Sequence, residues 1–233
     1  MSPKILFITL SNIGDVVCTT PVLQALLDRP DQPRVSVLVG PKAVALFQGD
    51  AALDKVIAYD KHMSLGQKLM FVRLLKTKCF DEVVDLRNSL FPLAILGWRG
   101  LRSLFSWGSK KKDHAVLRHW RRAFGKDAVA SELRFHVKVS EKAQKRADAL
   151  LSGVQSPFVA LAPGAASDLK RWPLEKFAEI LRRLGQAGVG QAVLLGGPEN
   201  QSLSAKLQEL APGCAFDLTG KTALITGAAG LLG

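Results

Sequence analysis

The segment Ser-Asn-Ile-Gly-Asp at 11–15 carries a carboxylate that could act as a general base. It follows an apolar run and precedes residues with helical apolar spacing, so we expect it between a strand and a helix. Gly14 would let the backbone turn tightly, and Asp15 would lie in the first helical turn. A carboxylate placed there can accept a proton from a bound hydroxyl group. The alternative is that Asp15 only stabilises the helix N-terminus, as most Asp residues in this position do.

A second segment, APGAASDLKRWP at 162–173, has the composition of a phosphate-binding loop. Small residues such as Gly164 and Ala165 allow a phosphate to approach the backbone, and Lys170 with Arg171 can neutralise its charge. The helix expected from Pro173 offers its positive end. These features favour a ligand that bears a pyrophosphate. The alternative is a solvated loop with two incidental bases and a Trp packed over it.

A third segment, LLGGPEN at 194–200, also follows an apolar run. Its glycines permit close approach of a ligand, and the carboxylate of Glu199 or the amide of Asn200 could bind ribose hydroxyls. A Gly-Gly-Pro turn is weak evidence by itself, because turns of this composition are common.

Short apolar runs alternate with segments of helical periodicity along the chain, which predicts an α/β fold with parallel sheets covered by helices on both faces. The carboxyl ends of such strands share one edge, where open α/β folds bind their ligands. Strands are expected at 4–10, 35–39, 55–58, 82–86, near 103–106, at 158–162 and at 192–195, and helices at 16–27, 42–47, 65–75, 115–124, 140–151, 173–186 and 201–210.

Two similar α/β domains are predicted, at 1–151 and 158–233, joined by a polar linker at 152–157. The second domain has residues for about three strands, whereas doubly wound domains usually have five or six. We therefore expect the second domain to be truncated.

The composition is that of an ordinary globular protein, with 233 residues, 48% hydrophobic and 22% charged, which excludes wholesale disorder and fibrous repeats. No apolar stretch approaches the roughly 20 residues that span a bilayer, and no signal peptide is seen, so we expect a cytoplasmic protein. Cys18, Cys79 and Cys214 have no C-x-x-C spacing, so neither disulfides nor structural zinc are expected.

Basic residues gather in the first part of the chain. Residues 1–150 carry 25 Lys and Arg against 14 Asp and Glu, whereas residues 151–233 carry 7 against 6. Between 97 and 126 Asp113 is the only acidic residue among nine basic ones. Such a patch suits an anionic partner, and the alternative is a solvated basic face. Nucleic acid is not expected, since the region has no helix-turn-helix, zinc-finger or stacked-aromatic pattern.

Together these motifs resemble glycosyltransferase family 9, the heptosyltransferases of lipopolysaccharide assembly, over residues 4–222. The matching segments are IGDV at 13–16, TPVL at 20–23, VDLRNS at 84–89, PGA at 163–165, KRWP at 170–173, GGP at 196–198 and DLTGKT at 217–222.

The resemblance implies a GT-B architecture, in which one Rossmann-like domain binds the acceptor and a second binds a nucleotide-sugar donor, typically ADP-heptose. It implies inverting, metal-independent transfer to the lipopolysaccharide inner core without a cofactor, with Asp15 as the base and Lys170 on the donor pyrophosphate. Donor-binding residues would be Gly164, Ala165, Lys170 and Glu199, and acceptor-binding residues would be Asn12, Gly14, Arg87, Lys110, Lys111, Arg118 and Arg121. The basic first domain would meet the anionic acceptor peripherally at the inner membrane.

The sequence departs from the family pattern in three places. Family members carry an acidic residue just after the Gly-Gly-Pro turn, and in this sequence Glu199 and Asn200 leave the register of that residue open. The D-S/T-G-x-x-H loop that family members have at the donor site is missing from this sequence. An alternative is therefore that the chain is an inactive remnant of such an enzyme. Residues 221–233 instead resemble the opening strand and glycine loop of short-chain dehydrogenases and epimerases, without the helix that an NAD site needs. The alternative function is a non-catalytic basic module that binds anionic lipid or saccharide at the inner membrane face.

Overall fold

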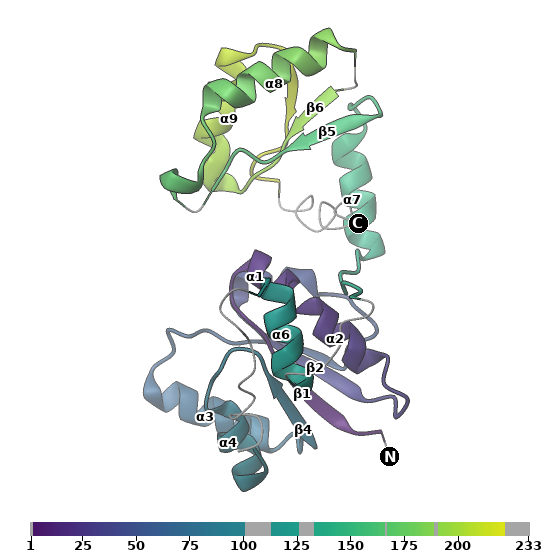
Figure 1. The fold of residues 1–233 in the computed structure, drawn as a ribbon, viewed down its shortest axis with the longest axis vertical. Coiled ribbons are helices and arrows are strands. Elements are labelled where there is room, and N and C mark those ends of the chain that lie inside the picture. Colours follow the sequence, from purple (N-terminus) through teal and green to yellow (C-terminus); the bar gives the residue numbers. More distant parts are fainter. Residues whose placement is uncertain (1, 101–112, 126–132, 166, 189–190, 222–233) are drawn as a thin grey trace. The chain divides into compact units, whose positions relative to one another are not determined.

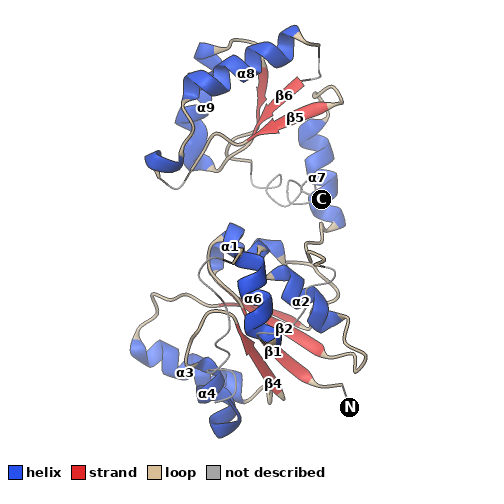
Figure 2. Ribbon diagram, viewed as in Figure 1, coloured by secondary structure: helices blue, strands red, loops and turns tan. Residues whose placement is uncertain are grey.

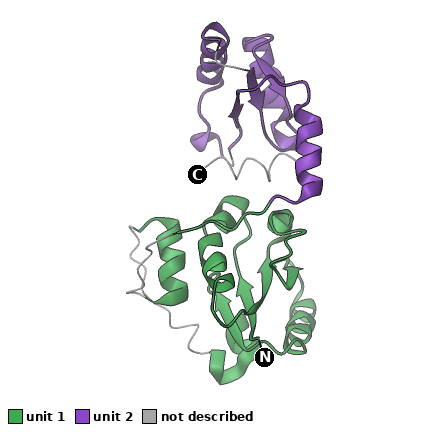
Figure 3. Cartoon of the chain, turned by 90° about the vertical axis from the view of Figure 1, so that its right-hand side faces the viewer, with its two compact units in different colours: residues 1–138 green, residues 139–233 purple. Residues whose placement is uncertain are grey.

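The computed structural model describes residues 2–100, 113–125, 133–165, 167–188 and 191–221. They belong to two compact units, Met1–Lys138 and Val139–Gly233 (Figure 3). Each unit contains a parallel β-sheet with helices packed against it (Figure 2). The predicted α/β class is therefore confirmed.

The first unit has a four-stranded sheet in the order β3-β2-β1-β4 (Figure 1). Its strands are β1 (Lys4–Ile8), β2 (Arg34–Val39), β3 (Lys55–Ala58) and β4 (Glu82–Asp85). Its helices are α1 (Ile13–Val17), α2 (Thr20–Leu27), α3 (Leu65–Lys76), α4 (Phe91–Leu96) and α6 (Ala115–Phe124), with short 3-10 helices η1 (Pro41–Leu46) and η2 (Gly97–Gly100).

The helices of this unit form two layers because the central strand β1 is apolar on both faces. Ile5 and Phe7 are fully buried in a cluster that includes residues of α1, α2 and η1 and against which α6 packs. Leu6 and Ile8 point to the other face, where they pack with residues of α3 and α4. This alternation follows from the two-residue period of a strand.

The helix predicted at 16–27 is two helices. Pro21 has no backbone N–H, so it cannot donate to the carbonyl of Val17, and α1 ends there. The Thr20 hydroxyl donates instead to the Val17 carbonyl at 2.8 Å, while the Thr19 hydroxyl lies 2.7 Å from that of Thr9. The break turns α2 along the sheet and leaves α1 as a separate short helix.

Two further elements are expected in the first unit, a helix at 42–47 and a strand near 103–106. The helix expected at 42–47 is present over residues 41–46, as the 3-10 helix η1 rather than as an α-helix. Its hydrogen bonds span three residues, as in this tighter helix: the Ala43 N–H donates to the Gly40 carbonyl at 3.0 Å and the Phe47 N–H to the Val44 carbonyl at 3.1 Å. The strand expected near 103–106 lies outside the described residues.

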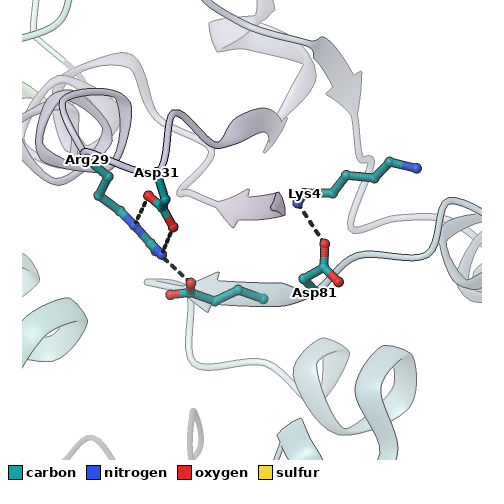
Figure 4. A network of polar contacts seen from close by, with 5 residues as sticks. Lys4, Arg29, Asp31 and Asp81 are labelled. Atoms are coloured by element: carbon teal, nitrogen blue, oxygen red, sulfur yellow. Dashed lines mark hydrogen bonds and ion pairs between the residues drawn. The ribbon is translucent and has the colours of Figure 1, made fainter. Parts of the chain in front are cut away.

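A hydrogen bond and two ion pairs join the elements at the amino edge of this sheet (Figure 4). The Lys4 backbone N–H donates to the Asp81 carboxylate at 2.8 Å. Arg29, which follows α2, donates to Asp31 and to Glu82 of β4, each at 2.7 Å. These contacts tie the end of α2 to β4 at the edge opposite to the strand carboxyl ends.

The second unit has a three-stranded parallel sheet in the order β5-β6-β7. Its strands are β5 (Phe158–Leu161), β6 (Gln191–Leu194) and β7 (Ala215–Asp217), and its helices are α7 (Glu141–Leu151), α8 (Leu174–Gln186) and α9 (Gln201–Leu210), with 3-10 helices η3 (Asp168–Lys170) and η4 (Pro198–Asn200). Ala192 and Leu194 pack in a cluster with residues of α8 and α9, and Val193 packs in a separate cluster with the end of α7.

The division between the units differs from the expected boundary at residue 151. Leu150 and Leu151 of α7 pack with Val193 of β6, so this helix belongs to the second unit. The polar segment 152–157 joins α7 to β5 inside that unit. Polarity alone marked it as a linker, but the apolar side of α7 decides the boundary.

A buried polar cluster holds the end of the first unit. His136 and Asp50 contact each other through Nε2 and a carboxylate oxygen, and each side chain is 2% exposed. His136 Nδ1 lies 2.8 Å from Gln24 Oε1, and the Gln24 amide nitrogen donates to Asp28 at 2.8 Å. Because that bond turns the amide oxygen toward His136, Nδ1 must donate. The cluster fastens segment 133–138 to α2 and to the turn after η1.

We expect His136→Ala to lower the free energy of unfolding by about 3 kcal/mol, since it leaves the buried Asp50 carboxylate without its main partner. The Ala52 N–H at 3.0 Å and Lys138 at 4.0 Å would remain. Urea denaturation followed by circular dichroism measures the loss. Arg134→Gln is the control, because it breaks an exposed ion pair with Asp28 and should cost under about 1 kcal/mol. Equal losses in both variants would contradict the prediction.

Candidate functional site

The segment that leaves β1 is held against the end of β2 by a close backbone approach. A Cβ on Gly40 would lie 2.7 Å from the Ser11 Cα, so only glycine fits without a shift of the backbone. The Gly40 N–H also donates to the Leu10 carbonyl at 3.3 Å. These contacts fix the start of α1 at the carboxyl edge of the sheet and thereby place Asp15 there.

The Asp15 side chain is exposed on the first part of α1. Its carboxylate accepts one hydrogen bond from a described residue, from the Asn12 amide nitrogen at 3.0 Å. Asn12 is the N-cap of α1 but makes no side-chain bond to the helix backbone. Among the described residues, therefore, Asp15 does not cap the helix. Its second oxygen is open to a ligand.

The reason that we expected for Gly14 is wrong. Gly14 lies inside α1, and its φ is not in the left-handed region that favours glycine. A Cβ on Gly14 would have no heavy atom within 4 Å. The glycine is therefore not required by a tight turn, and it leaves open space one residue before Asp15.

Helix α6 brings basic side chains to this edge. Its apolar side, with Val116 buried and Trp120 and Ala123 half-buried, holds the helix on the first unit, while Arg118 is exposed. The Arg118 guanidinium makes no hydrogen bond or ion pair with another described residue. It is thus free to meet an anion.

Charge effects show that Arg118 and Asp15 lie in one neighbourhood. Burial raises the pKa of the Cys18 thiol, Asp15 raises it further, and Arg118 lowers it. Burial lowers the pKa of the His119 imidazole, with a further lowering by Arg118 and Arg122 against an opposing effect of Asp15. His119 therefore favours its neutral form beside the carboxylate. No local sequence pattern singles out His119, because only the packing of α6 places it there.

Two neighbouring arginines of α6 have partners. Arg121 forms an ion pair with Asp113. Arg122 donates to the Asp85 carbonyl at 3.0 Å and to the Asn88 side chain at 2.5 Å, so it ties α6 to the loop after β4. An acceptor anion would have to compete with Asp113 for Arg121.

Arg87 follows β4, next to β1 in the sheet, and so lies at the same edge as Asp15. Its guanidinium carbon is 5.1 Å from the centre of the Tyr59 ring. Its Nη1 is buried without a hydrogen-bond partner among the described residues. The loop itself is shaped by Asp85, which accepts bonds from the N–H groups of Arg87 and Ser89 at 2.8 and 2.7 Å. Lys110 and Lys111 lie outside the described residues.

In the second unit the loops after β5 and β6 meet at the Asn200 side chain. A Cβ on Gly164 would lie 2.3 Å from Asn200 Oδ1, and one on Gly196 would lie 2.9 Å from Asn200 Cβ. Asn200 thus fills the space that the two glycines leave, which is a structural role. Ala165 follows Gly164 and is half-buried.

Glu199 and Asn200 differ in their surroundings. The Glu199 side chain is exposed and folds over Gly197, where a Cβ would lie 2.4 Å from its carboxylate oxygens. Of the two residues after the turn, Glu199 is therefore the more exposed.

Lys170 ends η3 in the loop between β5 and α8, and its side chain is exposed. It makes no ion pair with another described residue, whereas its neighbour Arg171 pairs with Asp168 at 2.7 Å. The ring of Trp172 packs edge-on against Phe177 at 5.0 Å between centres, which anchors the loop to α8. Lys170 is thus held on an anchored loop with its charge free.

The described residues contain neither a metal-binding cluster nor a membrane-spanning helix. No group of three or more His, Cys, Asp or Glu side chains there is arranged to hold a metal ion. No helix there is long and apolar enough to cross a membrane.

The fold is shared with solved glycosyltransferases. The glycosyl transferase family 9 structure from Veillonella parvula has a TM-score of 0.83 at 20% identity, over 97% of this chain and 72% of that one. E. coli ADP-heptose lps heptosyltransferase II has a TM-score of 0.75 at 22% identity, over 97% of this chain and 75% of that one. E. coli heptosyltransferase WaaC with ADP-2-deoxy-2-fluoro heptose has a TM-score of 0.66 at 21% identity, over 98% of this chain and 79% of that one. The predicted GT-B-type α/β fold is thereby confirmed.

At the level of sequence, a search of curated proteins gave no match. The dehydrogenase-like segment at 221–233 lies outside the described residues except for Lys221, and its interpretation stays a prediction. The model of glycosyltransferase family 9 (heptosyltransferase), however, matches residues 68–232. Since this match covers most of the sequence, the chain belongs to glycosyltransferase family 9, the heptosyltransferases.

Proposed function

We propose that this chain transfers a heptose from an ADP-activated sugar to the inner core of lipopolysaccharide. The observation that carries the proposal is the exposed Asp15 carboxylate, which is bonded by Asn12 alone among the described residues and lies near Arg118. Family membership supports the reaction class. The E. coli WaaC structures with ADP and with ADP-2-deoxy-2-fluoro heptose support the donor.

In this mechanism Asp15 accepts the proton of an acceptor hydroxyl as its oxygen attacks the anomeric carbon of the donor. The new C–O bond forms while the bond to the phosphate oxygen breaks, so ADP leaves and the configuration inverts. Lys170 neutralises charge that develops on the diphosphate, and the proposal assigns this role to the side chain rather than to a metal. Gly164, Ala165 and Glu199 complete the donor side.

Arg118 and Arg87 are the acceptor contacts in this proposal, which is supported by the lack of an acidic partner for either side chain among the described residues. The phosphates and acidic sugars of the inner core would provide the matching charge. Arg121 would join them only by leaving Asp113. The acceptor is anchored in lipid, so the protein would meet it at the cytoplasmic face of the inner membrane as a peripheral protein.

We expect Asp15→Asn to lower turnover by at least about 100-fold, because the amide cannot accept the hydroxyl proton. ADP release in the presence of donor and acceptor measures turnover, and calorimetry with ADP should show unchanged affinity. Unchanged turnover in Asp15→Asn or Asp15→Ala would contradict the assigned role.

We expect Lys170→Gln to weaken ADP binding about tenfold, through loss of a charge-assisted contact with the diphosphate. Lys176→Gln is the matched control, since Lys176 is an exposed lysine on α8 that pairs with Glu179 at 3.3 Å. Titration calorimetry with ADP compares them. If the unaltered chain binds anionic lipid but neither ADP nor donor, the non-catalytic basic module becomes the better explanation.

The environment of Asp15 can be tested through His119. Because its pKa in the fold lies below the unfolded value of about 6.5, the unfolded chain binds more protons near that pH, and acid should destabilise the fold. The melting temperature of the wild type should fall more steeply from about pH 7 to about pH 5 than that of His119→Gln. His62→Gln, at an exposed histidine, should keep the wild-type slope. Equal slopes in all three proteins would contradict the placement of His119.

A further inference from the structure

The outer face of α3 is apolar although nothing in the described chain covers it. Leu65, Leu69, Met70 and Leu74 are 85%, 56%, 69% and 53% exposed. The inner side of the same helix is occupied by other residues, Phe71, Val72 and Leu75, which pack on the sheet. The exposed side chains are therefore not needed to hold the helix in place.

The neighbouring helix continues this surface. Phe91 of α4 packs against Phe71 of α3 with ring centres 6.2 Å apart, and both helices cover the sheet face of Leu6 and Ile8 (Figure 1). Their outer sides thus face away from the sheet together. Beyond Phe91, Leu93 is 37% exposed and Trp98 in η2 is 87% exposed. We call the outer surface of α3, α4 and η2 the α3–α4 face.

The charge on this face has one sign. The segments 61–80 and 86–100 contain no Asp or Glu. Arg73, Lys76 and Arg99 are exposed and make no ion pair with another described residue. Large apolar side chains thus alternate with unpaired bases, with Trp98 among them.

We propose that the α3–α4 face docks onto an anionic lipid bilayer. Leu and Met side chains would enter the boundary between headgroups and acyl chains, Trp98 would lie at headgroup level, and the bases would contact lipid phosphates. A second copy of the chain fits less well, because a two-fold interface would bury the bases of two such faces together, and the segments that form the face carry no Asp or Glu to pair with them.

The orientation suits the proposed reaction. In a parallel α/β unit, a helix begins at the edge where the preceding strand ends, so the N-termini of α3 and α4 lie at the carboxyl edge of the sheet, as does Asp15. Leu65 and Leu90, 85% and 71% exposed, stand at these two helix starts. The link to a lipid-anchored acceptor rests on the proposed function, whereas the docking itself does not.

The test is flotation of the full chain with vesicles of phosphatidylcholine alone or mixed with phosphatidylglycerol. The wild type should float with the mixed vesicles only and lose binding at high salt. Leu69→Gln with Met70→Gln, and separately Arg73→Gln with Lys76→Gln, should each lower the partition coefficient about tenfold or more.

Matched controls lie on other surfaces of the molecule. Lys142→Gln with Lys145→Gln removes two exposed bases from α7, and Leu210→Gln changes an exposed leucine at the end of α9. Both should bind as the wild type does. Thermal melts should show that all variants fold, since every altered side chain is exposed.

Three results would overturn the proposal: no flotation of the wild type, equal loss in the α7 control, or unchanged binding in both α3 variants. A dimer that the α3 variants dissociate in sedimentation velocity, without vesicle binding, would also overturn it. Transfer to a deacylated acceptor reports on the proposed function separately. Intact transfer without flotation rejects the docking alone, and flotation without transfer rejects the enzyme assignment alone.

Discussion

The parallel pairing of β1 with β2 on one side and β4 on the other determines where the functional side chains of the first unit can lie. Ile8 pairs with Leu38 and with Asp85, so the three strands end at one level. The loops that follow therefore share one edge. A shift of the register by one residue would turn the buried side chains of β1 to the opposite faces, so burial on both faces holds this arrangement.

Helix α6 shows why a basic cluster in a sequence does not identify the bases that bind a ligand. Composition is enough to locate the cluster. Which of its bases already have protein partners depends on the folded geometry. Arg121 pairs with Asp113, Arg122 ties α6 to the loop after β4, and Arg118 has no such partner among the described residues. The neutral tendency of His119 likewise follows from burial that no local pattern encodes.

Most elements of the fold could be predicted because strands and helices leave different apolar periods in the sequence. The strand at 55–58 and the helix at 201–210 have the predicted bounds. The failures come from effects that periodicity does not contain: Pro21 divides one helix, η1 tightens a short one, and the packing of Leu150 assigns α7 to the second unit. The positions of the loops after the strands were enough to predict where the site lies. That Asn200 fills the space beside Gly164 and Gly196 could not be predicted, because it depends on the packing of two loops that are distant in the sequence.

The exposed side chains of α3 need an explanation outside the folded unit. Each large apolar side chain that stays in water forgoes about 1.5–3 kcal/mol of burial, and α3 is already held by Phe71 and Leu75. An anionic bilayer accounts for both the apolar side chains and the unpaired bases, whereas burial against a copy accounts only for the former. On this view the two basic surfaces of the first unit have separate partners. The bases near Asp15 meet the saccharide, and those around Trp98 meet the lipid that carries it.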